Sequence, residues 1–209
     1  EIGCGAGSIA QKLAEAGADL TAIDLTDKAI ELTKKRFDLL DVSAIIKQND
    51  AEALDFPDNS FDFIWSWGVI HHSANTSQIV KEIHRVLKPN GKASIMVYHR
   101  NSTRYIVYGG LSKGILNGYF FRYRSLYEVN MTFTDGYIAR HYTRKNAARL
   151  FSSFSSVSTR VMDGEVPAMF RGWDMLTRLL PIVMKPLNRW IVNRYGWFLS
   201  VSYTHLTLP

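Results

Sequence analysis

Cysteine and proline are scarce in this chain of 209 residues, which contains one cysteine and six prolines. The single thiol, Cys4, excludes an internal disulfide framework and any metal site built from several cysteines. No apolar run approaches the roughly 20 uninterrupted residues that a membrane-spanning helix needs. Hydrophobic residues at 46% and charged residues at 21% are ordinary for a globular protein, which argues against disorder and fibrous repeats. We therefore expect a globular chain in a reducing, cytoplasmic compartment.

Acidic residues are scarce in only one half of the chain. Residues 1–100 contain 11 Lys and Arg against 14 Asp and Glu, whereas residues 101–209 contain 14 against 5. The second half also holds 19 of the 26 aromatic residues. A basic, aromatic half is typical of a surface for nucleic acid, an anionic substrate or a membrane, and equally of a solvated face. Composition alone leaves these alternatives open.

Strand and helix patterns alternate through the first half of the chain with short connections. This alternation predicts βαβ units and a mostly parallel sheet, on which each helix packs one apolar stripe. The expected strands cover residues 1–2, 20–24, 44–48, 61–66 and 92–98. The expected helices cover residues 8–16, 26–40 and 76–87, with Thr26 and Thr76 as N-caps.

Residues 99–142 interrupt this alternation with five glycines among many aromatic side chains. Because a structureless loop of this length is uncommon in a compact domain, we expect helical pieces that form a cap. The elements expected after it are a helix over 143–154, strands over 157–162 and 197–201, and an apolar helical stretch over 172–195. Pro181 and Pro186 are expected to kink that stretch. Residues 202–209 fit no element and are interpreted as a non-native tail.

The strongest chemical signal is the run Glu1-Ile2-Gly3-Cys4-Gly5-Ala6-Gly7, at the turn between the first strand and the first helix. Alternate glycines let the backbone approach a ligand closely, and the helix N-terminus beyond them offers free N–H groups. The spacing differs from the dinucleotide pattern G-x-G-x-x-G. Asp24 follows Gly7 by 17 residues and ends the second strand, where a carboxylate can bind ribose hydroxyls. Together they predict a nucleoside-like ligand.

Four blocks of the sequence resemble class I S-adenosylmethionine-dependent methyltransferases, in the small-molecule group that includes ubiquinone-biosynthesis-like enzymes. The blocks are residues 1–7, 22–25, 49–62 and 85–92. The resemblance implies an α/β fold with a Rossmann-like, doubly wound, mostly parallel sheet of seven strands. It further implies a truncated first strand, an antiparallel last strand and an α-helical cap insertion. The chain lacks an initiator Met and begins inside a motif, so we expect an N-terminally truncated fragment.

On this basis the chain is expected to divide into an S-adenosylmethionine-binding core, a cap insertion, a C-terminal completion of the core with a helical insertion, and the tail. The expected parts cover residues 1–98, 99–142, 143–201 and 202–209. The resemblance is good over the first of these parts and weak afterwards. It is therefore specific for the cofactor, S-adenosylmethionine, and almost silent about the substrate.

The resemblance assigns a set of residues to the cofactor. These are Glu1, Gly3, Cys4, Gly5, Gly7, Asp24, Leu25, Asp50, Ala51, Ser66 and Trp67. It implies that Asp24 accepts hydrogen bonds from both ribose hydroxyls and that Asp50 accepts from the adenine amino group. The alternatives are that Asp24 only caps the next helix, a task that Thr26 performs better, and that Asp50 is an ordinary turn residue. For Cys4, a small buried side chain is a simpler interpretation than a nucleophile.

Methyl transfer by in-line displacement depends mostly on placing the nucleophile close to the methyl group and aligning the two. A general base is needed only for hydroxyl or carbon acids. The candidates at the carboxyl edge of the sheet are His71, His72, Tyr98 and His99. At most one of the two adjacent histidines is expected to face a substrate, and local hydrogen bonding is their alternative role. No metal site is expected, because no i,i+4 partner or cysteine set accompanies them.

We therefore expect methyl transfer to an oxygen, nitrogen or carbon atom of a small-molecule acceptor, lipid-like or anionic. The aromatic cap either encloses this acceptor or forms a small core of its own. The alternatives are an NAD-dependent oxidoreductase and a non-catalytic nucleoside-binding protein or inactive fragment. Nucleic acid is not expected as a partner, because Ser66-Trp67-Gly68 stands where a base-flipping motif would follow the fourth strand.

Three cations recur every seven residues on the proline-containing apolar stretch, namely Arg171, Arg178 and Lys185. This spacing is consistent with a helix that lies on an anionic membrane surface. An ordinary surface helix with a solvated basic face has the same spacing, and we favour that interpretation. The sequence does not determine the acceptor, the oligomeric state or the activity of the fragment.

Overall fold

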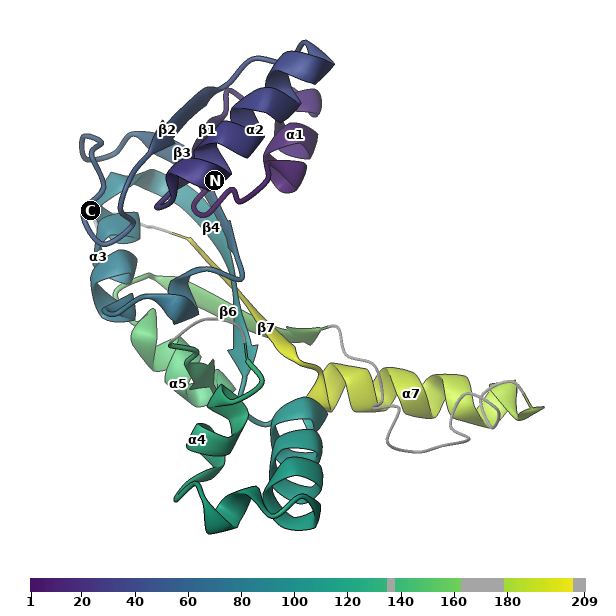
Figure 1. The fold of residues 1–209 in the computed structure, drawn as a ribbon. Helices are drawn as coiled ribbons and strands as arrows, with labels where there is room; N and C mark the ends of the chain where they lie inside the picture. The colour runs from purple at the N-terminus through teal and green to yellow at the C-terminus, as the bar shows by residue number, and fades with distance from the viewer. Residues whose placement is uncertain (135–137, 163–178, 205–209) are drawn as a thin grey trace. The chain divides into compact units, whose positions relative to one another are not determined.

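The computed structural model describes residues 1–134, 138–162 and 179–204 (Figure 1). The chain divides into two units. The first comprises Glu1–Ile95, Leu150–Val157 and the chain from Ser202 on. The second comprises Met96–Arg149 and Ser158–Val201. Among the described residues, no helix has both the length and the apolar character to cross a membrane.

The first unit is built on parallel strand pairing. Strand β1 (Thr21–Asp24) pairs with β2 (Ile45–Gln48) in parallel, from Thr21 opposite Ile45 to Asp24 opposite Gln48. Ile2 forms a parallel bridge with Ile23 of β1, and its N–H donates to the Trp65 carbonyl of β3 (Phe61–Trp67) at 2.8 Å. The predicted first strand therefore pairs on both of its sides.

The remaining strands form a five-stranded sheet. Strand β4 (Leu87–His99) lies between β3 and β7 (Phe198–Thr204), and β6 (Ser156–Met162) pairs with β7. The short strand β5 (His141–Tyr142) pairs with the end of β4 in parallel. The predicted α/β architecture with a mostly parallel sheet is confirmed.

Three helices of the first unit form where the sequence predicts them, at α1 (Ser8–Glu15), α2 (Asp27–Leu40) and α3 (Thr76–Val86). Helices α1 and α2 lie side by side next to β1 and β2 (Figure 1). Thr26 caps α2, because its hydroxyl accepts the Ala29 N–H at 3.3 Å. The predicted cap of α3 is wrong by one residue, since Asn75 accepts the Gln78 N–H at 3.2 Å. Asn and Thr are both good N-caps, so local sequence does not separate them.

The second unit contains the helical pieces that were predicted after β4. They are η2 (Arg104–Leu116, a π-helix), η3 (Tyr119–Phe121), α4 (Leu126–Met131), α5 (Arg144–Leu150) and α7 (Pro181–Tyr195). Thr143 caps α5 as predicted, by accepting the Asn146 N–H at 3.1 Å. Pro181 does not kink a helix but begins α7, where the missing N–H has no cost. Residues 163–178 lie outside the described residues, and with them Arg171 and Arg178.

Strand β7 is longer than the sequence analysis predicts. It runs to Thr204 and includes three residues that were assigned to no element. Leu199, Val201 and Tyr203 alternate along it and are all buried, and the Tyr203 ring lies 3.9 Å from that of Phe154 between centroids. This period-two pattern was the signal that the sequence analysis missed. Residues 205–209 lie outside the described part of the chain.

Candidate functional site

A pocket of about 440 Å³ lies in the first unit, where β1 and β2 end. Ligands of open α/β sheets bind at this edge, and the volume is ample for a small ligand. Of the residues predicted to bind a cofactor, the pocket is lined by Gly3, Asp24, Leu25, Asp50 and Ala51. The structure thus brings together three sequence blocks that are separated by about 20 residues each.

The glycine turn has the left-handed backbone that its sequence requires. Gly3, Gly5 and Gly7 have φ angles of 79°, 55° and 77°. A Cβ atom on Gly3 would clash with the Val69 side chain, and one on Gly7 would come within 2.9 Å of Thr33 Cγ2. At positions 3 and 7, therefore, both the positive φ angle and the lack of room for a Cβ atom require glycine. Only Gly3 of the three lines the pocket.

Asp24 holds the turn and the next helix together. Its Oδ2 accepts the Gly5 N–H at 3.0 Å, and its Oδ1 accepts both the N–H and the hydroxyl of Thr26 at 3.0 Å. An ionised carboxylate offers about four acceptor positions, two on each oxygen. Oδ2 uses one of its positions for Gly5 and can accept a further hydrogen bond from a ligand. Thr26 is the cap of α2, as predicted, and Asp24 orients it.

The segment after β2 forms a tight turn at the pocket. Asp50 Oδ1 accepts the Glu52 N–H at 2.8 Å, and the Asp50 carbonyl accepts the Ala53 N–H at 3.1 Å. Asp50 is thus both a turn residue, which was the alternative interpretation, and an exposed carboxylate that lines the pocket. Leu25, which is 64% exposed, supplies an apolar surface on the same wall.

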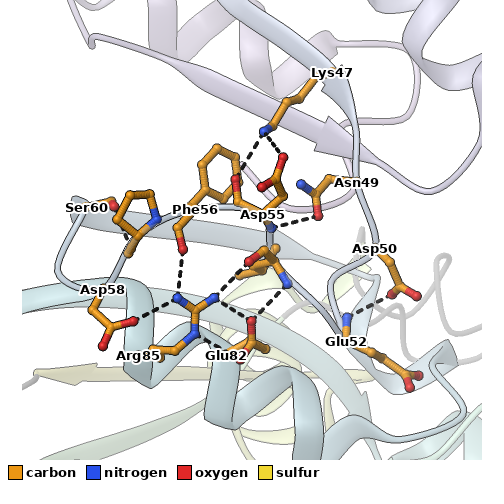
Figure 2. Close-up of polar contacts among 12 residues, drawn as sticks. Lys47, Asn49, Asp50, Glu52, Asp55, Phe56, Asp58, Ser60, Glu82 and Arg85 are labelled. Carbon is orange, nitrogen blue, oxygen red and sulfur yellow. Dashed lines mark hydrogen bonds and ion pairs between the residues drawn. The ribbon is translucent and has the colours of Figure 1, made fainter.

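Arg85 of α3 fastens the rest of that segment to the unit (Figure 2). Its guanidinium donates to the carbonyls of Leu54 and Phe56 at 2.8 and 2.7 Å, and to the carboxylates of Asp58 and Glu82 at 2.9 and 2.6 Å. Glu82 in turn accepts the Leu54 N–H at 2.9 Å. The hydrogen bond from Arg85 lowers the pKa of the Glu82 carboxyl, which stays ionised. No sequence motif indicated this cluster.

Glu52 joins the segment to the turn that carries the two histidines. Its Oε1 accepts the Ser73 hydroxyl at 2.6 Å and the Asn75 N–H at 2.9 Å. His71 and His72 belong to the short helix η1 (Ile70–His72) that precedes this contact. His72 lines the pocket, whereas His71 is fully buried. Of the two histidines, His72 is therefore the one that a ligand in this pocket could contact.

The other predicted residues lie elsewhere. Cys4 packs in a core cluster, where burial raises the pKa of its thiol and Thr33 donates to its Sγ at 3.5 Å, so it is not an activated nucleophile. Glu1 accepts the Ala10 N–H of α1 and thereby holds the glycine turn, while burial raises the pKa of its carboxyl to about 7. Ser66 is fully buried in β3, and Trp67 stacks on a neighbouring ring.

Tyr98 and His99 belong to the second unit. Tyr98 stacks on Trp197 with centroids 5.5 Å apart, and His99 Nδ1 lies 3.0 Å from the Gly196 carbonyl. Burial lowers the pKa of His99. Pocket residues that the sequence analysis did not single out include Val69, Ser73, Ala74 and Ile79. They come from a turn without periodic pattern and from the next helix, so only their position after β3 could have indicated them.

Comparisons with known proteins agree with this geometry. Residues 1–95 match a family described as "Methyltransferase domain". The chain is 32% identical over 98 residues to 27-O-demethylrifamycin SV methyltransferase of Amycolatopsis mediterranei, which covers 46% of this chain and 36% of that protein. It is 31% identical over 107 residues to the mitochondrial ubiquinone biosynthesis O-methyltransferase of Arabidopsis thaliana, covering 50% and 33%. The chain thus spans about a third of the length of these curated relatives.

A solved structure extends the likeness to the fold of the whole chain. A SAM-dependent methyltransferase from Methanosarcina mazei has a TM-score of 0.63 at 20% identity, and the match covers 99% of this chain and 91% of that one. Residues 1–95 are therefore similar to a methyltransferase domain, and the likeness to the solved structure shows a Rossmann-like fold. The name of that structure specifies S-adenosylmethionine, the cofactor that the sequence resemblance implies for this chain.

Proposed function

We propose that this chain transfers a methyl group from S-adenosylmethionine to a small-molecule acceptor. The observation that supports this proposal is the pocket at the ends of β1 and β2. Asp24 ends β1 and Asp50 follows the end of β2, and both line the pocket beside the glycine turn. A nucleoside needs acceptors for its ribose hydroxyls and its exocyclic amine, together with an apolar wall for its base. Asp24, Asp50 and Leu25 supply these three features in one pocket.

When bound, the cofactor supplies a methyl group that is already activated on a sulfonium. The task left to the protein is placement, which is worth a large part of the barrier. Oδ2 of Asp24 can accept a hydrogen bond from one ribose hydroxyl and still accept the Gly5 N–H. A second ribose hydroxyl would donate to Oδ1, which also accepts from Thr26. His72 is the titratable base candidate on the pocket wall for an acceptor that loses a proton.

For the acceptor, we propose a hydroxyl group on a large, mostly apolar molecule. The support comes from two relatives, whose names specify methylation of a rifamycin precursor and O-methylation in ubiquinone biosynthesis. The aromatic, basic second half of the chain is chemically suited to such an acceptor. We also propose a reducing, cytoplasmic compartment, which the single buried cysteine supports.

Calorimetric titration of the chain with S-adenosylhomocysteine tests this function, with NADH as the competing ligand. We expect micromolar binding of S-adenosylhomocysteine and no binding of NADH. Asp24→Ala removes charge-assisted hydrogen bonds and should weaken binding by about 10- to 100-fold. Asp27→Ala, which removes an exposed carboxylate in the first turn of α2, is the matched control and should bind like the wild type. Preference for NADH, or equal affinity in the two variants, would contradict the proposal.

A further inference from the structure

Helix α7 presents an apolar face outward. Ile182 is 88% exposed, Val183 63% and Trp190 58%. Pro186 and Leu187 are also exposed. These five residues follow the spacing i, i+1, i+4, i+5 and i+8, which at 100° a residue places them within an arc of about 140°. The apolar stripe of a globular helix has this spacing, but here it is on the exposed side.

The opposite side of α7 is less exposed. Met184 is buried, and Asn188, Ile191 and Val192 are half-buried. These residues fall on the other arc of the helix, so the two sides are distinct. Figure 1 shows α7 running directly into β7, whose buried residues fix the end of the helix in the second unit. The outward apolar face therefore belongs to an anchored helix.

The charges of α7 have one sign. Its sequence contains Lys185, Arg189 and Arg194 and no Asp or Glu. Lys185 and Arg189, four residues apart, border the apolar arc on one side. Among the described residues, the ion pairs include none from this helix. Two copies packed through this face would bring these cations together without an acid between them, which is unfavourable. The face is instead complementary to a surface that is apolar inside and anionic outside.

We propose that α7 docks on an anionic lipid surface, with Ile182 and Trp190 inserted at the level of the head groups and Lys185 and Arg189 against lipid phosphates. Helices that bind membranes in the interface plane combine a bulky apolar face containing Trp with flanking cations. This proposal concerns a helix of the second unit, whereas the residues that line the pocket belong to the first, and it does not depend on the methyl transfer proposed above. It replaces the interpretation favoured from the sequence, in which the basic face of this helix is only solvated.

Co-sedimentation of the full chain with phosphatidylcholine vesicles, with and without phosphatidylglycerol, tests the proposal. We expect binding to the vesicles that contain phosphatidylglycerol, and weaker binding as salt is added. Replacing Lys185 and Arg189 by Gln should weaken binding about fivefold for each cation. The pair Ile182→Ser and Trp190→Ser should weaken it at least about tenfold at any salt concentration.

Matched controls come from α2. Leu39→Ser changes a side chain that is 86% exposed in the first unit. Lys28→Gln with Lys35→Gln removes two exposed cations that pair with Glu31. Both controls should bind vesicles like the wild type. An unchanged midpoint of urea denaturation shows that each α7 variant is folded.

A second measurement does not depend on weakened variants. Brominated lipid should quench part of the tryptophan fluorescence of the wild type, and Trp190→Phe should remove that part while vesicle binding persists. The proposal is overturned if the wild type does not sediment with anionic vesicles or sediments equally with neutral ones. It is also overturned if light scattering shows a dimer that the Ile182 and Trp190 substitutions dissociate, because the face then belongs to a second copy.

Discussion

Helices α3 and α7 use their apolar residues in opposite ways. In α3 the apolar side chains Ile79, Val80, Ile83 and Val86 are buried, and Arg85 is held by acidic partners. In α7 only Met184 is buried, and the cations have no acid in the same helix. A helix whose stripe faces inward contributes to the core, whereas one whose stripe faces outward offers a surface to something else. The comparison separates a scaffold helix from a docking helix.

The sharpest test of this contrast is Ile83→Ala in α3. Ile83 is fully buried, so the substitution removes packed methyl groups and leaves a cavity. We expect the free energy of unfolding to fall by about 3 kcal/mol, measured by urea denaturation. A loss of less than about 1 kcal/mol would show that α3 is not the scaffold helix that its burial indicates.

Arg85→Ala probes the polar side of the same helix. The substitution removes the donor to the carbonyls of Leu54 and Phe56 and leaves Glu82 with the Leu54 N–H alone. Because the Arg85 side chain is 31% exposed, water replaces part of these contacts, and we expect a loss of about 2 kcal/mol in urea denaturation.

The control for Arg85 is Lys81→Ala, which removes an exposed cation from the same helix. It should leave stability within about 0.5 kcal/mol of the wild type. Equal losses in the two variants would mean that the Arg85 cluster is no more than a surface ion pair. The contrast with the cations of α7, which have no acid in their own helix, would then disappear.

Glu52 tests how the start of α3 is tied to the pocket. Glu52→Ala removes the acceptor for Ser73 and for the Asn75 N–H, so the pocket turn loses its link to the segment after β2. We expect binding of S-adenosylhomocysteine to weaken about tenfold by calorimetry. Glu52→Gln keeps an oxygen acceptor and should stay within about threefold of the wild type. If both variants lose affinity equally, the charge of Glu52 matters rather than its hydrogen bonds.

The parts of the site that sequence could predict are those in which one residue type at one position is required by backbone physics. Gly3 and Gly7 need a left-handed backbone and lack room for a Cβ. Asp24 and Asp50 follow strands that are identifiable from their own apolar residues. Local pattern is sufficient at such positions, because each depends on its own segment and on the rule that ligands bind at strand ends.

The remaining parts depend on contacts between distant segments. Arg85 holds residues about 30 positions away through backbone carbonyls, whose identity no side chain encodes. His71 and His72 are adjacent, and only the turn of η1 decides that one is buried and the other lines the pocket. For α7, the apolar pattern predicts a helix but not which side faces outward. The periodicity of apolar residues predicts an apolar stripe on the helix. Only the packing of the helix decides whether that stripe lies in the core or on the surface.

The smallest expected effect is that of Ile182→Ala in α7, the counterpart of Ile83→Ala. Ile182 is 88% exposed, so its removal leaves no cavity, and Ala is the better helix former. We expect the free energy of unfolding to stay within about 0.5 kcal/mol of the wild type in urea, while vesicle binding weakens. A loss comparable to that of Ile83→Ala would place the stripe of α7 in a core, and the two helices would then be alike. Equal stability with reduced lipid binding is the result that separates them, because the same side chain then stabilises the fold in one helix and contacts a partner in the other.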